Sequence, residues 1–275
     1  MTGPTLAYTY AVARWTSGLE QAVGAITGVA GCRVHLVRAT NEQSLVAAVS
    51  SVPSDDFDEV ALRRHLEELP WLEEVARAHH GVIEAIASHT TVLPLRLATV
   101  HLDDGRVRSV LDARQNAFLD RLAELAGLLE WGVKLYVDVA AVPPPPPAKD
   151  LGPGRAYLRH RRAEQDLRQD SYQAAGTAAE RIDATARLHA VDRVRHRVQQ
   201  GELAPGPGTN IVNDAYLVPV EHAAAFRAEA LQAADGLPGV RIDVTGPWAP
   251  YSFAMPPEGE EGPHRESGGR PPGHP

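Results

Sequence analysis

Twelve histidines make metal binding the first chemistry to consider in this sequence. His189, Asp192 and His196 follow one another at helical spacing, which would place two imidazoles and a carboxylate on one helix face. The same pattern also describes a polar face turned to solvent or to a partner. His79 and His80 are adjacent, so on a helix they point in different directions. We therefore predict no metal site.

Three other features could carry chemistry, and each has an ordinary structural explanation. Cys32 could be reactive, but a single cysteine among small residues is typical of a half-buried position. Asp55, Asp56 and Asp58 suit the N-terminus of a helix, where negative charge is stabilised. Arg96, isolated in an apolar run, could bind an anion or form a structural ion pair. Because no GxSxG, HExxH, CxxC or phosphate-binding glycine loop is present, we predict no catalytic residue, no cofactor and no enzyme.

The composition indicates a protein with a real core and an acidic surface. Hydrophobic residues make up 44% of the 275 residues, and the net charge is −8. A negative net charge argues against general nucleic-acid binding. One cysteine cannot form an internal disulfide, which suits a reducing cytoplasm. No stretch is apolar enough to predict a signal peptide or a membrane span. We therefore expect a cytoplasmic protein.

Residues 70–99 are expected to organise the fold as a long helix that leads directly into a strand. Alternation after Thr90 predicts the strand over 91–101, with Pro94 at a start, an edge or a bulge because proline cannot donate to a ladder. The helix is predicted from apolar side chains that recur every three or four residues, namely Leu72, Val75, Ala76, His79, Val82, Ile83, Ile86 and Ala87.

The remaining first half mixes the two kinds of element without regular alternation, which favours an α+β class over a doubly wound sheet. Strands are predicted over 6–14, 33–37, 45–51 and 130–139, and helices over 57–69 and 107–127.

The second half begins with five consecutive prolines, Pro143 to Pro147, which predict a stiff spacer or a docking motif for a proline-reading partner. Residues 155–200 contain no proline and predict a helical arm, roughly 70 Å long if continuous. A break near 171–176 would give a helical hairpin or a bent arm. Strands over 211–219 and 240–246 and a helix over 221–234 complete a ferredoxin-like sheet with helices on one face.

These patterns predict an α+β protein of two domains. The N-terminal α+β domain covers 1–130, and the C-terminal ferredoxin-like domain covers 131–255, including a proline-rich linker over 143–154 and the long helical arm over 155–200. Residues 256–275 lack apolar side chains to bury, which predicts a disordered tail. An apolar stripe in the second half of the arm needs a covering surface, from its own chain or from another. The partner-binding candidates in and around this stripe are Ile182, Leu188, Val191, Val194 and Val198.

Several motifs resemble the gas vesicle protein F/L family in their order and spacing. Together they span most of residues 6–254, while the five-proline run and the segment after Met255 look like additions. The matching stretches are YTYAV at 8–12, LVAAVSSVPSDDF at 45–57, LPWLEEVARAH at 69–79, VLPLRLATV at 92–100, EWGVKLYVD at 130–138, AYLRHRR at 156–162 and TGPWAPYSF at 245–253.

The resemblance implies a two-domain α+β protein whose C-terminal domain is a modified ferredoxin fold with a long helical insertion. It implies no known catalysis. It implies association with the small hydrophobic shell protein of the gas vesicle and with other accessory proteins during nucleation or growth, and self-association is compatible with it. The alternative from another class is a regulatory protein whose ferredoxin-like domain binds a small effector.

Overall fold

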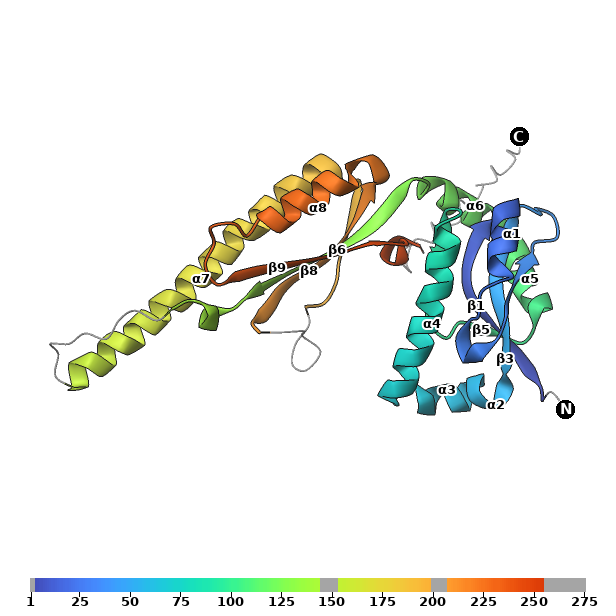
Figure 1. Cartoon of the computed structure of the whole chain (residues 1–275), viewed down its shortest axis with the longest axis horizontal. Helices are drawn as coiled ribbons and strands as arrows, with labels where there is room; N and C mark the ends of the chain where they lie inside the picture. Colours follow the sequence, from blue (N-terminus) through green and yellow to red (C-terminus); the bar gives the residue numbers. More distant parts are fainter. Residues whose placement is uncertain (1–2, 144–152, 199–206, 255–275) are drawn as a thin grey trace, which may run out of the picture.

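The computed structural model describes residues 3–143, 153–198 and 207–254. Within them, two antiparallel sheets follow one another along the long axis, and one long helix extends beyond the second sheet (Figure 1). The predicted tail 256–275, most of the predicted linker 143–154 and the last two residues of the predicted arm lie outside the described residues. The mixture of helices and antiparallel sheets confirms the predicted α+β class.

The first sheet has the order β2-β3-β1-β4, with β5 also paired to the central strand β1. Its strands are β1 (Thr5–Arg14), β2 (Val34–Arg38), β3 (Leu45–Pro53), β4 (Val92–Pro94) and β5 (Val100–His101). The helices of this half are α1 (Ser17–Val23), α2 (Ser54–Phe57), α3 (Glu59–His65), α4 (Leu69–Ala87), α5 (Asp104–Ala113) and α6 (Gln115–Glu124).

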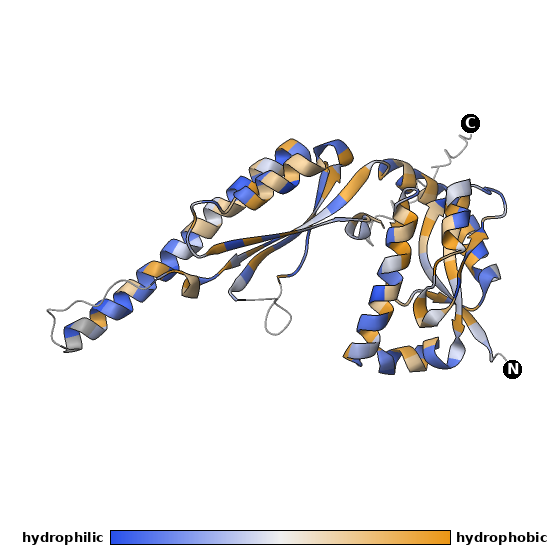
Figure 2. Ribbon diagram, viewed as in Figure 1, coloured by the Kyte–Doolittle hydropathy of each residue, from blue (hydrophilic) through white to orange (hydrophobic). Residues whose placement is uncertain are grey.

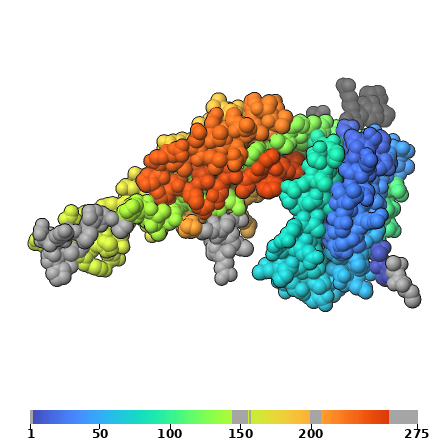
Figure 3. All heavy atoms as spheres, viewed as in Figure 1, coloured from blue at the N-terminus to red at the C-terminus, as the bar shows by residue number. Residues whose placement is uncertain are grey.

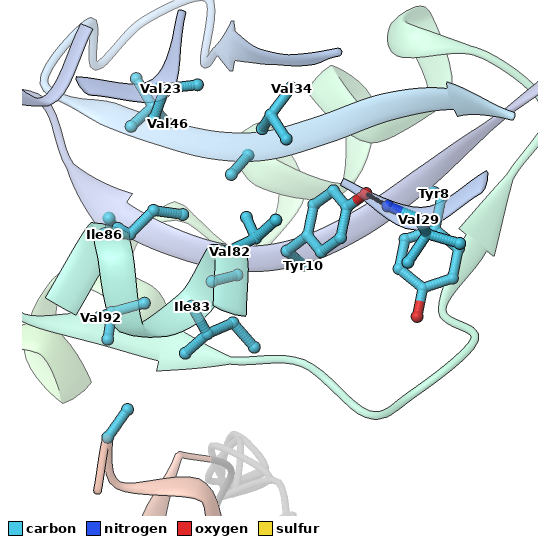
Figure 4. Packing of buried hydrophobic residues seen from close by; sticks show 14 of the residues in the cluster. Tyr8, Tyr10, Val23, Val29, Val34, Val46, Val82, Ile83, Ile86 and Val92 are labelled. Atoms are coloured by element: carbon cyan, nitrogen blue, oxygen red, sulfur yellow. Dashed lines mark hydrogen bonds between the residues drawn. The ribbon is translucent and has the colours of Figure 1, made fainter. Parts of the chain in front are cut away.

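Helix α4 confirms the predicted organising helix. Pro70 lies in its first turn, where a missing N–H costs nothing. His79, Val82, Ile83 and Ile86 are buried on the face toward the sheet, as the apolar stripe predicts. Figure 4 shows Val82, Ile83 and Ile86 packed in this core together with the ring of Tyr10 from β1.

The prediction of one strand over 91–101 is wrong, because residues 95–99 leave the ladder as a loop, the β4–β5 loop. Pro94 ends β4, and the following N–H, that of Leu95, still donates to the Tyr10 carbonyl oxygen of β1 at 2.9 Å. Ala98 adopts a left-handed φ of 60°, and its N–H donates to Tyr8 Oη at 3.1 Å. The chain rejoins β1 where the Thr9 N–H donates to the Thr99 carbonyl oxygen at 2.9 Å.

The predicted helix over 107–127 is also interrupted, at Arg114, whose φ of −115° separates α5 from α6. Both helices pack on the sheet face opposite α4, through Val107 and Leu111 of α5 and Phe118 of α6. The first sheet is therefore covered by helices on both faces.

The second sheet has the order β7-β8-β6-β9. Two helices, α7 and α8, pack on one face of it, which confirms the predicted ferredoxin-like arrangement. Its elements are β6 (Leu128–Val137), α7 (Pro153–His189), β7 (Asp192–Arg195), β8 (Thr209–Pro219), α8 (Ala223–Gln232) and β9 (Val240–Trp248). The limits 1–130 and 131–255 stay predictions.

The predicted arm over 155–200 differs from the structure in two ways. Helix α7 ends at His189, and β7 then pairs with β8 as the fourth strand that a split βαβ sheet requires. The alternation of Val194 between two arginines is a strand signal that the helical interpretation overlooked. The predicted break near 171–176 is absent, because Ser171, Ala175 and Ala178 bury one face of a single unbroken helix.

Both sheets have one topology. In each, the first strand is followed by a helix, a hairpin of two strands, further helix and a last strand, and the spatial order is second-third-first-fourth. The first half therefore has the same order of strands and helices as the ferredoxin-like second half. The sequence does not reveal this shared order, because three helices, α2, α3 and α4, stand between β3 and β4 where the second half has only α8 between β8 and β9.

A C-terminal segment joins the two halves. Residues 249–254, the C-terminal strap, follow β9 and place Ala249 in the core under α4 and Phe253 in the core under α6. Tyr251 Oη lies 2.9 Å from His80 Nδ1 on α4. Arg121 on α6 donates from Nε to the Phe253 carbonyl oxygen at 2.7 Å.

Among the helices of the described residues, none combines the length and the apolar character needed to cross a bilayer.

Candidate functional site

The structure does not bring together the histidines considered as metal ligands. His189 ends α7, and its Nε2 lies 3.1 Å from Glu229 Oε1 on α8. Asp192 begins β7, and His196 Nε2 lies 3.0 Å from Ser252 Oγ in the C-terminal strap. The common helix face does not exist, because the chain leaves the helix after His189. In the three described segments, no group of three or more His, Cys, Asp or Glu side chains is placed to hold a metal ion.

The other candidates for chemistry occupy structural positions. Cys32 is half-buried, and burial raises the pKa of its thiol, which disfavours the nucleophilic thiolate. Asp55 and Asp56 lie in the first turn of a helix, α2, but the single helix predicted over 57–69 is wrong, because the chain breaks at Asp58 and α3 ends at His65. Asp58 caps α3 by accepting the Ala61 N–H at 2.8 Å. None of these side chains is positioned as part of a catalytic set.

The five predicted partner-binding residues lie in different environments and form no single stripe. Ile182 is 1% exposed and packs between α7 and the second sheet. Val194 is half-buried in the core that α6 shares with β8. Leu188, in the last turn of α7, is 70% exposed, and Val191, just after the helix, is 60% exposed. Val198 is 38% exposed beyond β7. Of the five, only these last three have exposed apolar side chains.

A larger exposed surface lies at the other end of the same helix. The outer half of α7 (residues 155–170) extends past the second sheet (Figures 1 and 3). Ala163 and Leu167 are half-buried, and every other side chain described in this range is exposed. Two of the exposed side chains are large and apolar, since Tyr157 is 62% and Leu158 is 67% exposed. Figure 2 shows that their surroundings are mostly hydrophilic.

The charge of the outer half of α7 differs from that of the whole chain. It carries five arginines and three acidic residues, while the chain has a net charge of −8. His160 and Glu164 pair one turn apart at 3.2 Å, and the Arg168 guanidinium lies 6.0 Å from the Tyr172 ring centroid. The result is a basic helix surface with exposed aromatic and aliphatic groups, a composition enriched in protein interfaces.

The inner half of α7 is fixed to the sheet by a partly buried ion cluster. Arg193 on β7 donates to Asp183 on α7 at 2.7 Å and forms a second ion pair with Asp214 on β8. The Asp214 side chain is only 4% exposed, so its charge depends on this arginine. This cluster anchors the helix from which the outer half projects.

The sequence favours the second half of the arm for partner binding, because that half contains the cleaner apolar stripe. Only part of that stripe packs on the chain's own sheet, at Ile182 and Ala186, while Leu188 and Val191 are exposed. The signal that could have found the outer half is the opposite one, namely Tyr157 and Leu158 in a highly charged stretch with no repeating apolar face to bury.

Comparison with known proteins agrees with this architecture. A family model described as "Gas vesicle synthesis protein GvpL/GvpF" matches residues 6–255. Gas vesicle protein L of Streptomyces sp. (strain CB03234) is 40% identical over 92% of this chain and 94% of that protein. Gas vesicle protein F of the same organism is 28% identical over 90% and 98%.

Two solved structures share the fold. The gas vesicle protein GvpF from Microcystis aeruginosa superimposes with a TM-score of 0.61 at 19% identity, over 91% of this chain and 99% of that one. GvpF from Anabaena sp. PCC7120 gives 0.59 at 19% identity, over 91% and 96%. Since the family model spans nearly all described residues and the sequence relative is well above 30% identity, this chain belongs to the GvpL/GvpF family of gas vesicle accessory proteins.

Proposed function

We propose that this chain is a non-enzymatic accessory protein that binds the small hydrophobic shell protein during nucleation or growth of the gas vesicle. The observation that carries the proposal is the outer half of α7, which projects from the second sheet and exposes Tyr157 and Leu158. The association takes place in the cytoplasm, at the surface of the forming vesicle.

The physical support is that the rest of the chain stabilises a projecting helix only weakly through packing contacts. Isolated helices of about 12–15 residues are marginal in water, and most helices are stabilised by packing of an apolar face. Here the outer half continues a helix that is nucleated and anchored by its inner half, so it is preformed, and among the described residues only Ala163 and Leu167 of it are half-buried. Binding to a preformed helix avoids the entropy cost of ordering it.

Leu188 and Val191 supply a second, smaller contact at the other end of α7. Both are exposed large aliphatic side chains close to one another in the chain. We propose that Val198 contributes to the same contact. An apolar subunit that must be kept from aggregating would be held at these points, while the charged side chains around them keep the complex in water.

The test is co-expression of the tagged chain with the shell protein, followed by pull-down. The arm variant carries Tyr157→Asp and Leu158→Asp, and the turn variant carries Leu188→Asp and Val191→Asp. The matched control is Leu102→Asp, which alters an exposed leucine (74%) of the first half. Circular dichroism checks that each variant keeps its helix content.

Loss of soluble shell protein from the arm variant, with retention by the control, would support the proposal. A weaker loss is expected from the turn variant. Equal recovery of shell protein by the wild type and both variants would refute binding through α7, and no recovery by the folded wild type would refute direct shell binding.

A further inference from the structure

A cavity of about 280 Å³ lies between the first sheet and its outer helices, and it is separate from the surface proposed for the shell protein. The sheet supplies the floor through Val12 and Ala47, and α5 and α6 supply walls through Leu111 and Phe118. The β4–β5 loop supplies a further side. The cavity therefore exists because the strand predicted over 91–101 is interrupted, and a continuous strand would place no loop there.

One buried polar group in this cavity has no partner. Thr9 is 1% exposed and lines the floor, and its Oγ1 has no hydrogen-bond partner among the residues that the structure describes. Its backbone N–H is already used by the Thr99 carbonyl oxygen. Buried hydroxyl groups in folded proteins are almost always hydrogen-bonded, so an unpaired one that faces a cavity indicates a group that a ligand would complete.

Cationic side chains also line the cavity. Arg96 and Arg114, both exposed, line it together with the half-buried His101. Burial lowers the pKa of His101, so this ring is neutral near pH 7 and the two guanidinium groups carry the charge. None of the described lining residues is acidic. Guanidinium groups pair with carboxylates through two parallel hydrogen bonds, which gives them a preference for that anion.

We propose that this cavity binds a small carboxylic acid with an apolar chain and a second oxygen, such as a medium-chain hydroxy acid. The carboxylate faces Arg96 and Arg114, the chain lies against Leu111 and Phe118, and the distal hydroxyl pairs with Thr9 Oγ1. The volume is close to the lower end of the range for small-molecule sites, which restricts the ligand to a short chain.

This site gives the small-effector alternative a definite location in the first sheet, whereas the sequence placed it in the ferredoxin-like domain of the second half. It does not depend on the shell-protein proposal, because α7 contributes no lining residue.

The test is isothermal titration calorimetry of the full chain with 8-hydroxyoctanoate, octanoate and 1-octanol. The hydroxy acid should bind with one site and more tightly than the other two. Thr9→Val replaces the hydroxyl with a methyl group of similar size and should weaken 8-hydroxyoctanoate about tenfold while leaving octanoate unchanged. Arg114→Gln should weaken both carboxylates at least fivefold.

Two further variants keep the test decisive. Arg108→Gln alters an exposed arginine of α5 that does not line the cavity, and it should bind as the wild type does. Val110→Trp fills the cavity from its half-buried rim and should abolish binding without touching Thr9. Absence of saturable binding to the folded wild type, equal affinity for 1-octanol, or unchanged binding by Val110→Trp would each overturn the proposal.

Discussion

His79 offers the sharpest test of the core, because its buried ring holds the β4–β5 loop. Its Nε2 lies 3.2 Å from the Leu95 carbonyl oxygen and its Nδ1 lies 3.0 Å from Tyr8 Oη. A carbonyl oxygen can only accept, so Nε2 carries the proton and Nδ1 accepts from Tyr8. The tyrosine oxygen in turn accepts the Ala98 N–H. A neutral ring satisfies all of these hydrogen bonds. A protonated ring would carry a second N–H at Nδ1, directed at the Tyr8 hydroxyl that donates to it.

Acid should therefore destabilise the fold through this residue. Burial lowers the pKa of His79 from 6.5 to about 4. The unfolded chain takes up the proton near pH 6.5 and the folded chain only near pH 4, so the stabilisation is complete above 6.5 and is lost as the pH falls. At about 1.4 kcal/mol per pKa unit, a change from pH 7 to pH 4.5 removes about 2.5 kcal/mol of unfolding free energy.

The assay is urea denaturation of the wild type and His79→Gln at both pH values. Glutamine can accept from Tyr8 and donate to Leu95, but it does not titrate. The wild type should lose about 2.5 kcal/mol more than the variant, since the carboxylates common to both proteins cancel in the comparison. His160→Gln, which alters an exposed histidine of α7, should follow the wild type. A parallel loss in wild type and His79→Gln would refute the reasoning.

Three further outcomes follow from the packing, and each is checked by chemical denaturation. Phe253→Ala should lower the unfolding free energy by about 3–5 kcal/mol, because it removes a 2% exposed ring from the core that joins the two halves. Arg193→Met should cost about 3–5 kcal/mol by leaving the Asp214 charge buried and unpaired, and Asp214→Asn in the same chain should recover part of it. Gly28→Ala should destabilise, because its methyl group would lie 2.2 Å from a buried tyrosine oxygen, whereas Gly81→Ala, with open space around it in α4, should stabilise by about 0.5–1 kcal/mol.

The sequence predicted those elements whose side chains repeat with a clear period. The stripe from Val75 to Ile86 predicted both the helix and its buried face, and His79 was correctly placed on that face. Strand positions in β1, β3, β6, β8 and β9 were also predicted to within a few residues. Local periodicity is sufficient in these cases because the burial it reports involves one face of one element.

The errors occurred where distant parts of the chain decide the structure. The β4–β5 loop depends on the Tyr8 hydroxyl, which bonds Ala98 from another strand. Strand β7 is short and charged. It forms because it pairs with the edge of β8 and because Arg193 forms ion pairs with Asp183 and Asp214. The stripe containing Ile182 was recognised as apolar, but only the fold shows whether a sheet or a partner covers it.

The length of α7 supports the proposal that its outer half binds a partner. A crossover helix in a split βαβ unit needs to return along the strand it follows, and β6 has 10 residues, about 34 Å at about 3.4 Å per residue. Helix α7 has 37 residues, about 55 Å at about 1.5 Å per residue. The excess is about 20 Å, or about 14 residues of helix. That excess corresponds to the exposed outer half, over 155–170, while the inner half is the part that packs. The outer half is thus not needed to cover the second sheet. We therefore propose that this surface is kept for binding a partner.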